Sequence, residues 1–266
     1  MTTVPAAATV RHTGLRAALS DRLTLSGRSL RLTRRDADTL VMSIVLPVVL
    51  MALFVHVFGG AISGRAEYVD YVVPGIVLLC AGFGAASTPM VVAADTTSGM
   101  VDRLRSLPVR SSAVLTGHVV ASVARTTVST AVVIAAGLLM GFRPDAGPLE
   151  WLAVAGLLLL YVLALSWLAA PLGVLASGVE SASALSFLVL SLPYLSSAFV
   201  RPETLPTALR AVAEHQPITP VIETLRGLLT GTPIGSSGWL ALLCYSGILA
   251  AAVTAAGWAY RHRGRS

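Results

Sequence analysis

Lysine is absent from the 266-residue sequence, and charged residues of all kinds make up only 12% of it. All 19 basic residues are therefore arginine, and 13 acidic residues leave a formal net charge of +6. Soluble domains carry roughly 25% charged residues. So few charges, with 55% hydrophobic residues and a mean hydropathy of +0.78, exclude an ordinary soluble fold. A bilayer accepts such apolar surface directly, which indicates a membrane protein.

The missing lysine also excludes a nucleotide-binding loop of the Gly-x-x-x-x-Gly-Lys-Ser/Thr type, in which the lysine reaches the phosphates. Work driven by ATP therefore requires a partner protein. The sequence has no His-Glu-x-x-His motif and no Ser-His-acid arrangement, which argues against an intramembrane enzyme. The two cysteines, Cys80 and Cys244, lie in apolar runs and are interpreted as small buried hydrophobes, not as a disulfide or metal ligands.

Six apolar stretches are long enough to cross a membrane, which takes about 20 helical residues. Hydrocarbon offers no partner for backbone polar groups, so only helices or closed barrels cross it. Strand-like alternation is absent, and the sequence predicts an all-α polytopic protein. The six predicted spans are 39–62, 71–94, 113–141, 151–176, 181–200 and 238–260.

Arginine is distributed unevenly between the two sides of these spans. Thirteen arginines lie before the first span, between the second and third, or after the last, and five lie in the other loops. By the positive-inside rule, both termini face the cytoplasm. We therefore expect a cytoplasmic tail over 1–38, a transmembrane domain over 39–260 and a basic cytoplasmic tail over 261–266. The arginine-only, alanine-rich composition favours a GC-rich bacterial genome, and hence a bacterial plasma membrane.

Basic charge beside hydrophobic spans favours anionic lipid headgroups over nucleic acid as a partner. Segment 15–32 has Leu15, Leu19, Leu23 and Leu30 at helical spacing with arginines between them. This pattern predicts an amphipathic helix on the cytoplasmic membrane surface. The alternative is a disordered basic tail.

The long loop over 201–237 contains an apolar stretch, 218–229, that is too short to span. Pro217 and Pro220 open it, and proline fits a first helical turn without losing a hydrogen bond. We expect a short helix that dips into the outer leaflet.

Ionisable residues are scarce within the predicted spans, which contain no Asp or Glu and only His56, His118 and Arg125. Ion-coupled transport usually needs ionisable groups inside the membrane, so their scarcity weakens that mechanism. Arg125 has two interpretations. It either reaches the inner interface or a backbone carbonyl, or it lines a translocation path or pairs with a carboxylate of another helix.

The cytoplasmic loop over 95–112 has its own pattern. Gly99 interrupts the chain after the second span, residues 100–107 fit a short amphipathic helix, and Pro108 ends it. Asp102, Arg103 and Arg105 would then contact a partner. The alternative is an ordinary charged loop.

Several motifs follow one another along the chain. They are Pro47 with Phe58-Gly59-Gly60, Tyr71-Val-Val-Pro-Gly75, Asp95 through Gly99 to Asp102-Arg-Leu-Arg-Ser-Leu-Pro108, and Gln216-Pro-Ile-Thr-Pro220 with Glu223-Thr-Leu-Arg226. In this order they resemble the permease subunits of type-2 ABC exporters, particularly the daunorubicin-resistance-like branch, along nearly the whole chain. The sequence departs from that pattern at Ala37, His118 and Ser122, where members often have Pro, Arg and Asp.

The resemblance implies that two six-helix subunits pair in the membrane, with two ATP-binding subunits beneath that hold ATP and Mg. We expect the pair to be a homodimer, and a pair of different permeases is the alternative. It assigns 15–32 to the interfacial helix, 100–107 to a coupling helix in a groove of the ATPase, and 218–229 to an outer re-entrant hairpin. No cofactor is expected in this chain. The implied ATPase-coupling residues are Asp95, Gly99, Asp102, Arg103, Leu104, Arg105 and Pro108. The other candidates are His118 and Arg125 in the third span, and Pro217, Thr219, Pro220, Glu223 and Arg226 in the outer segment.

The function that these features predict is export of a hydrophobic or amphipathic compound, such as a drug, antibiotic, lipid or glycan carrier. Two alternatives remain open at this point: a membrane-anchored assembly protein with no transported substrate, and an ion-coupled transporter. A partner ATPase with a phosphate-binding loop speaks against the first, and transport on a proton gradient alone speaks for the second.

Overall fold

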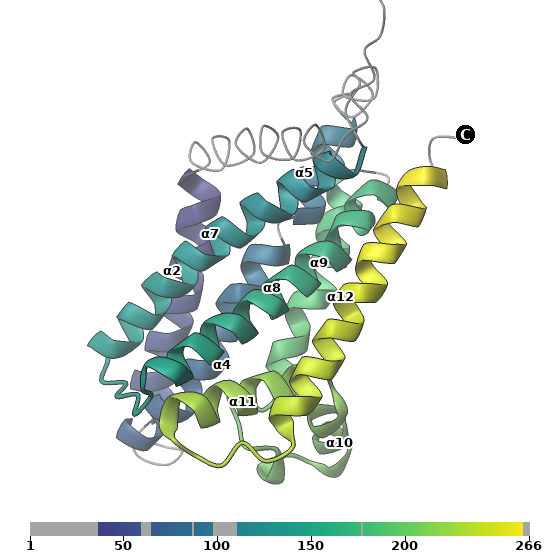
Figure 1. Ribbon diagram of the computed structural model, residues 1–266. Coiled ribbons are helices and arrows are strands. Elements are labelled where there is room, and N and C mark those ends of the chain that lie inside the picture. The colour runs from purple at the N-terminus through teal and green to yellow at the C-terminus, as the bar shows by residue number, and fades with distance from the viewer. Residues whose placement is uncertain (1–36, 60–64, 87, 98–110, 177, 263–266) are drawn as a thin grey trace, which may run out of the picture.

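The computed structural model describes residues 37–59, 65–86, 88–97, 111–176 and 178–262. In these ranges all regular secondary structure is helical (Figure 1). Five helical segments are long and apolar enough to cross a membrane, which confirms an all-helical, polytopic membrane protein. They correspond to the first four predicted spans and to the sixth. Their elements are α2 (Ala37–Leu53) with the π-helical turn η1 (Phe54–Phe58), α4 (Arg65–Ala86) with α5 (Thr88–Thr97), α7 (Ser111–Leu139), α8 (Pro148–Leu175) and α12 (Ser237–His262).

The second of these segments, made by α4 and α5, is the centre of the bundle. Of its most apolar 18 residues, 82% are buried, against 22% for the segments formed by α2 and by α12. Residues 72–73 and 76–81 of α4 are all buried, so other helices, and not lipid, cover α4 on every side. The outward faces of α2 and α12 expose valine and leucine side chains, as lipid contact requires.

The fifth predicted span, 181–200, is not one continuous helix. Helix α9 (Val179–Ser191) ends early, a 3-10 turn η2 (Leu192–Leu195) follows, and residues 196–199 form turns. Pro193 lies at the start of η2, where it has no N–H to donate to the preceding helical turn. The chain then packs back on α4, where the Tyr68 hydroxyl donates to the Phe199 carbonyl over 3.1 Å.

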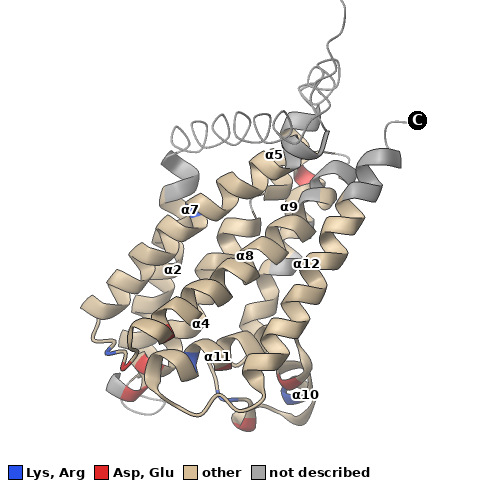
Figure 2. Cartoon of the chain, viewed as in Figure 1, with Lys and Arg blue, Asp and Glu red and all other residues tan. Residues whose placement is uncertain are grey.

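Three short elements lie across one end of the bundle, here called the α11 end. They are the 3-10 turn η3 (Pro202–Thr204), α10 (Thr207–His215) and α11 (Ile218–Thr230). The starts of α2 and α7 and the last turns of α5 and α12 lie at the opposite end (Figure 1). Acidic and basic residues gather at the α11 end, whereas the described parts of the long helices have few of them (Figure 2).

Candidate functional site

Helix α11 coincides with the short apolar stretch predicted at 218–229 and extends one residue beyond it. Pro217 precedes it, and Gly231 ends it with a left-handed φ of +69°, a conformation that glycine adopts readily. Thr219 donates its hydroxyl to the Ala213 carbonyl of α10, and Thr224 donates to the Pro220 carbonyl one turn earlier. Although α11 lies at the end of the bundle, most of its residues are buried. Helix α11 is therefore packed into the fold and is not a loosely attached surface segment.

Arg226 is the centre of the polar contacts at this end, and its side chain is only 11% exposed. Its Nη1 donates to Glu223 over 2.8 Å. Its Nε and Nη2 donate to the Tyr71 carbonyl over 3.3 and 3.2 Å, and Nη2 also donates to the Ser197 carbonyl over 2.9 Å. The guanidinium carbon lies 3.8 Å from the centre of the Tyr71 ring, a cation–π contact. We call these four residues the Arg226 cluster.

Tyr71 and Ser197 are also joined directly, because the Tyr71 hydroxyl donates to the Ser197 carbonyl over 2.9 Å. Gly75, one helical turn after Tyr71 on α4, lies against Ala198, the residue that follows Ser197. A Cβ at position 75 would lie 2.7 Å from the Ala198 carbonyl oxygen, a distance that real Cβ atoms do not reach. The turn over 196–199 is thus pressed against α4 with no room for a side chain between them.

Polar side chains on α7 form a second candidate region, on the face turned toward α4 and α8. Ser122 donates to the Gly84 carbonyl over 3.2 Å and lies 3.0 Å from the hydroxyl of Ser166 on α8. Nη2 of Arg125 lies 3.4 Å from the same Gly84 carbonyl. Arg125 is buried within the bundle and donates to this backbone carbonyl. The buried polar residues on this face of α7 are His118, Ser122, Arg125, Thr126, Ser129 and Thr130.

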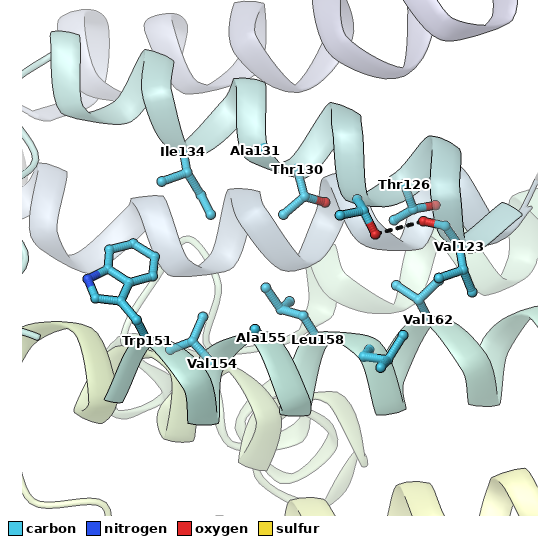
Figure 3. Close-up of a pocket in the computed structure, with 12 residues that line it drawn as sticks. Val123, Thr126, Thr130, Ala131, Ile134, Trp151, Val154, Ala155, Leu158 and Val162 are labelled. Atoms are coloured by element: carbon cyan, nitrogen blue, oxygen red, sulfur yellow. Dashed lines mark hydrogen bonds between the residues drawn. The ribbon is translucent and has the colours of Figure 1, made fainter. Parts of the chain in front are cut away.

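Beside this polar face, a groove of about 190 Å³ opens between α7 and α8 (Figure 3). Apolar side chains of both helices form most of its wall, with Trp151 at one end and Val162 toward the other. Thr126, Thr127 and Thr130 also line it. Pockets that enclose drug-sized ligands measure about 300–1000 Å³, so this groove has room for only part of such a molecule.

The ATPase-coupling residues implied by the resemblance lie mostly beyond the described part of the chain. Asp95 is in the last turns of α5, at the opposite end from α11. Segments 15–32 and 100–107 lie outside the described residues. So do the remaining coupling candidates, Gly99, Asp102, Arg103, Leu104, Arg105 and Pro108.

Two residues of the Arg226 cluster, Tyr71 and Ser197, were not among the predicted site residues. They are 155 and 29 positions away from Arg226. Tyr71 opens the Tyr71-Val-Val-Pro-Gly75 motif, but nothing in that local sequence shows that its carbonyl accepts from Arg226. Ser197 lies in a stretch interpreted as a helix, in which its carbonyl would be taken by the helix itself.

The charged residues in the described parts of the five candidate spans are Glu67, Asp70, Glu150 and Arg125. Glu67 and Asp70 lie near the start of α4 and Glu150 near the start of α8, so Arg125 is the one that lies well inside its helix. The fold and the site thus define a multi-pass helical membrane protein with an apolar groove in the bilayer region and a polar cap of short helices at one end. The model of the ABC-2 type transporter family matches residues 22–230, and the chain belongs to that family.

Curated relatives agree with this assignment. The chain is 31% identical to the daunorubicin resistance ABC transporter permease protein DrrB1 of Streptomyces coeruleorubidus, over 81% of this chain and 77% of that protein. It is 27% identical to the probable doxorubicin resistance ABC transporter permease protein DrrC of Mycobacterium tuberculosis, over 79% of each chain. The chain is therefore a permease subunit of an ABC exporter, a transport subunit and not the ATPase.

Proposed function

We propose that this permease moves a hydrophobic or amphipathic drug-like compound out of a bacterial cell, with energy from a partner ATPase that binds ATP and Mg. The observation that carries the proposal is the chemistry of the bundle interior. Its described candidate spans offer apolar packing, hydroxyls and one buried arginine. Their carboxylates, Glu67, Asp70 and Glu150, lie near the starts of α4 and α8 and not in the middle of a span. A coupling cation finds few ligands there. An apolar compound has no polar groups whose burial would cost free energy, so it can enter this interior.

Orientation follows from charge. The thirteen arginines at the termini and in the loop over 95–112 support a cytoplasmic location for that end, with the α11 end facing outward. Helix α9 and η2 complete a sixth crossing. Their 13 and 4 residues give about 28 Å of length at about 1.5 and 2.0 Å per residue, close to the hydrocarbon thickness of about 30 Å. An even number of crossings then leaves both termini cytoplasmic.

Coupling is assigned to the cytoplasmic loop that starts at Asp95. A short helix over 100–107 would sit in a groove of the ATPase, and its movement on ATP binding would pass into α5 and α4. For this to work, the contact must survive both states while the spans pack in two arrangements. Segment 15–32 is assigned to the inner membrane surface.

The substrate class rests on two observations. The two relatives carry names for daunorubicin and doxorubicin resistance, and the groove between α7 and α8 is largely apolar. Because about 190 Å³ falls short of a drug-sized pocket, we assign the rest of the path to the interface with a second copy of this permease. The complex is then two permeases and two ATPases.

The test is purification of the tagged chain from its native membranes in mild detergent, followed by mass spectrometry of what copurifies. We expect an ATPase with a phosphate-binding loop in a two-to-two complex, and ATP hydrolysis that rises several-fold with daunorubicin. A chain that purifies without an ATPase, or a complex whose hydrolysis no amphipathic compound changes, rejects the proposal.

A further inference from the structure

Three segments that are distant in sequence meet on one guanidinium at the α11 end. Arg226 belongs to α11, Tyr71 to the start of α4, and Ser197 to the turn after η2. The guanidinium donates to the carbonyls of both other segments and stacks on the Tyr71 ring. Arginine suits this position because its planar fork reaches several acceptors at once.

The contacts of Arg226 divide into two kinds. Glu223 lies three residues earlier on the same helix and pairs with Arg226 over 2.8 Å, so this ion pair moves with α11. The contacts with Tyr71 and Ser197 join α11 to other segments and break if those segments separate. Glu223 is 37% exposed at its side chain, so the pair gains solvent easily. A buried charge left without its partner costs much free energy. Opening avoids this cost, because Arg226 keeps Glu223 as its partner.

The contacts that would break are also the ones that hold the turn over 196–199 against α4. The Tyr71 hydroxyl and the Arg226 guanidinium bind the same Ser197 carbonyl. Next to it, Gly75 and Ala198 leave no space between the two backbones. Such close packing permits two discrete arrangements, together or apart, and few between them.

Helix α4 connects this contact to the rest of the bundle. With α5 it forms the most buried of the candidate spans, and α5 carries Asp95 at the opposite end. A displacement that starts at Asp95 thus reaches Tyr71 through one packed segment.

We propose that the Arg226 cluster is a releasable latch, closed in this structure, that opens when α4 moves during the ATP-driven cycle. This inference rests on the proposed function, because the partner ATPase would drive the movement that opens the latch. The closed state is the set of contacts that Arg226 makes in the structure. Opening frees the turn over 196–199 from α4, while Arg226 keeps Glu223 as its partner.

The experiment is hydrogen–deuterium exchange of the permease–ATPase complex in lipid nanodiscs, followed on peptides that cover 196–199 and the start of α4. Three variants are compared with the native chain. Arg226→Gln removes the charge, Arg226→Lys keeps the charge without the fork, and Tyr71→Phe removes only the hydroxyl. Arg210→Gln is the matched control, because Arg210 forms an exposed pair with Glu214 on α10, away from the cluster.

Without nucleotide, we expect Arg226→Gln to speed exchange in these peptides by at least about tenfold, Arg226→Lys and Tyr71→Phe by less, and Arg210→Gln not at all. In the native complex trapped with ATP, the same peptides should exchange at the rate of Arg226→Gln without nucleotide. This second result separates a latch from a static brace.

Two results overturn the proposal. One is faster exchange spread evenly over all helices of the Arg226 variants, which means general destabilisation. The other is equal protection of 196–199 in the free and ATP-trapped native complex. A complex that still exports while showing equal protection rejects the latch and leaves the proposed function standing. Variant effects confined to 196–199 in a chain that moves no drug reject the proposed function and leave the closed contact standing.

Discussion

The hydroxyl of Thr126 on α7 occupies the space where a side chain at Gly84 on α4 would stand. A Cβ at position 84 would lie 1.9 Å from Thr126 Oγ1 and 2.8 Å from Thr126 Cβ. The two backbones approach closely here because glycine has no side chain, as is common where membrane helices pack. The same approach brings the Gly84 carbonyl to Ser122 and Arg125.

We therefore expect Gly84→Ala to separate α4 from α7 and to lower the free energy of unfolding by about 1–3 kcal/mol, the usual cost of overpacking. Thermal unfolding in detergent measures the effect. Adding Thr126→Ala should restore part of the loss, because it removes Oγ1 and leaves only the Cβ contact.

Gly156→Ala on α8 is the control for this change, because no atom lies within 4 Å of a Cβ at that position. Its unfolding temperature should match that of the native chain. A Gly84→Ala chain as stable as the control would mean that α4 and α7 do not pack as described.

Helix positions follow from local sequence to a large extent, because about 20 apolar residues in a row have one stable solution in lipid. The first predicted span and α2 with η1 coincide in this way, and 218–229 coincides with α11. Over 181–200 the sequence predicted one helix, and the structure has α9, the 3-10 turn η2 and further turns instead. Pro193, which has no N–H to donate, lies at this change.

The contacts of the site can be predicted from local sequence much less well than the helix positions. Arg226 was predicted as a site residue, but its acceptors are backbone carbonyls of Tyr71 and Ser197. Every residue has a carbonyl, so no side-chain pattern marks which two are used. The same holds for the Gly84 carbonyl that Arg125 contacts.

The hydroxyl pair between α7 and α8 gives a second prediction. Ser122→Ala removes the bonds from Ser122 to the Gly84 carbonyl and to Ser166. Hydrogen bonds between membrane helices average about 0.6 kcal/mol, so the variant should lose roughly that much for each bond in the free energy of unfolding.

Ser183→Ala serves as the comparison for Ser122→Ala, since the Ser183 hydroxyl bonds only to the Val179 carbonyl within its own helix. That variant should unfold as the native chain does. A loss as large as that of Ser122→Ala would place the effect in helix propensity instead of helix packing.

The cytoplasmic loop gives a third prediction. Arg103→Glu and Arg105→Glu should each lower ATP-driven export at least about tenfold, because a reversed charge repels the surface that the arginine contacts. The amount of protein in the membrane should stay unchanged. Drug efflux from cells and quantitative membrane blots measure the two quantities.

Arg110→Glu, in the same loop but after Pro108, is the matched control for charge reversal and should export normally. If all three variants export at the native rate with the ATPase bound, the loop over 100–107 is not the coupling segment.

The groove between α7 and α8 gives a fourth prediction. Ala155 lines the groove from α8 (Figure 3), so Ala155→Trp should fill it and raise the KM for the exported drug several-fold. Complex assembly should not change. Concentration-dependent drug transport in inverted membrane vesicles measures the KM.

Ala153→Trp adds the same side chain to α8 at an exposed position outside the groove, so its KM should equal that of the native chain. Equal KM values for both variants would show that the substrate does not enter this groove.

The central claim is that this chain moves its substrate only with an external ATPase as the energy source. The most direct measurement is drug transport in proteoliposomes that contain the purified permease and its ATPase, with ATP on the ATPase side and no proton gradient. We expect transport that depends on ATP, stops when the catalytic carboxylate of the ATPase is neutralised, and does not respond to an imposed proton gradient. Transport by the permease alone on a proton gradient would contradict the account.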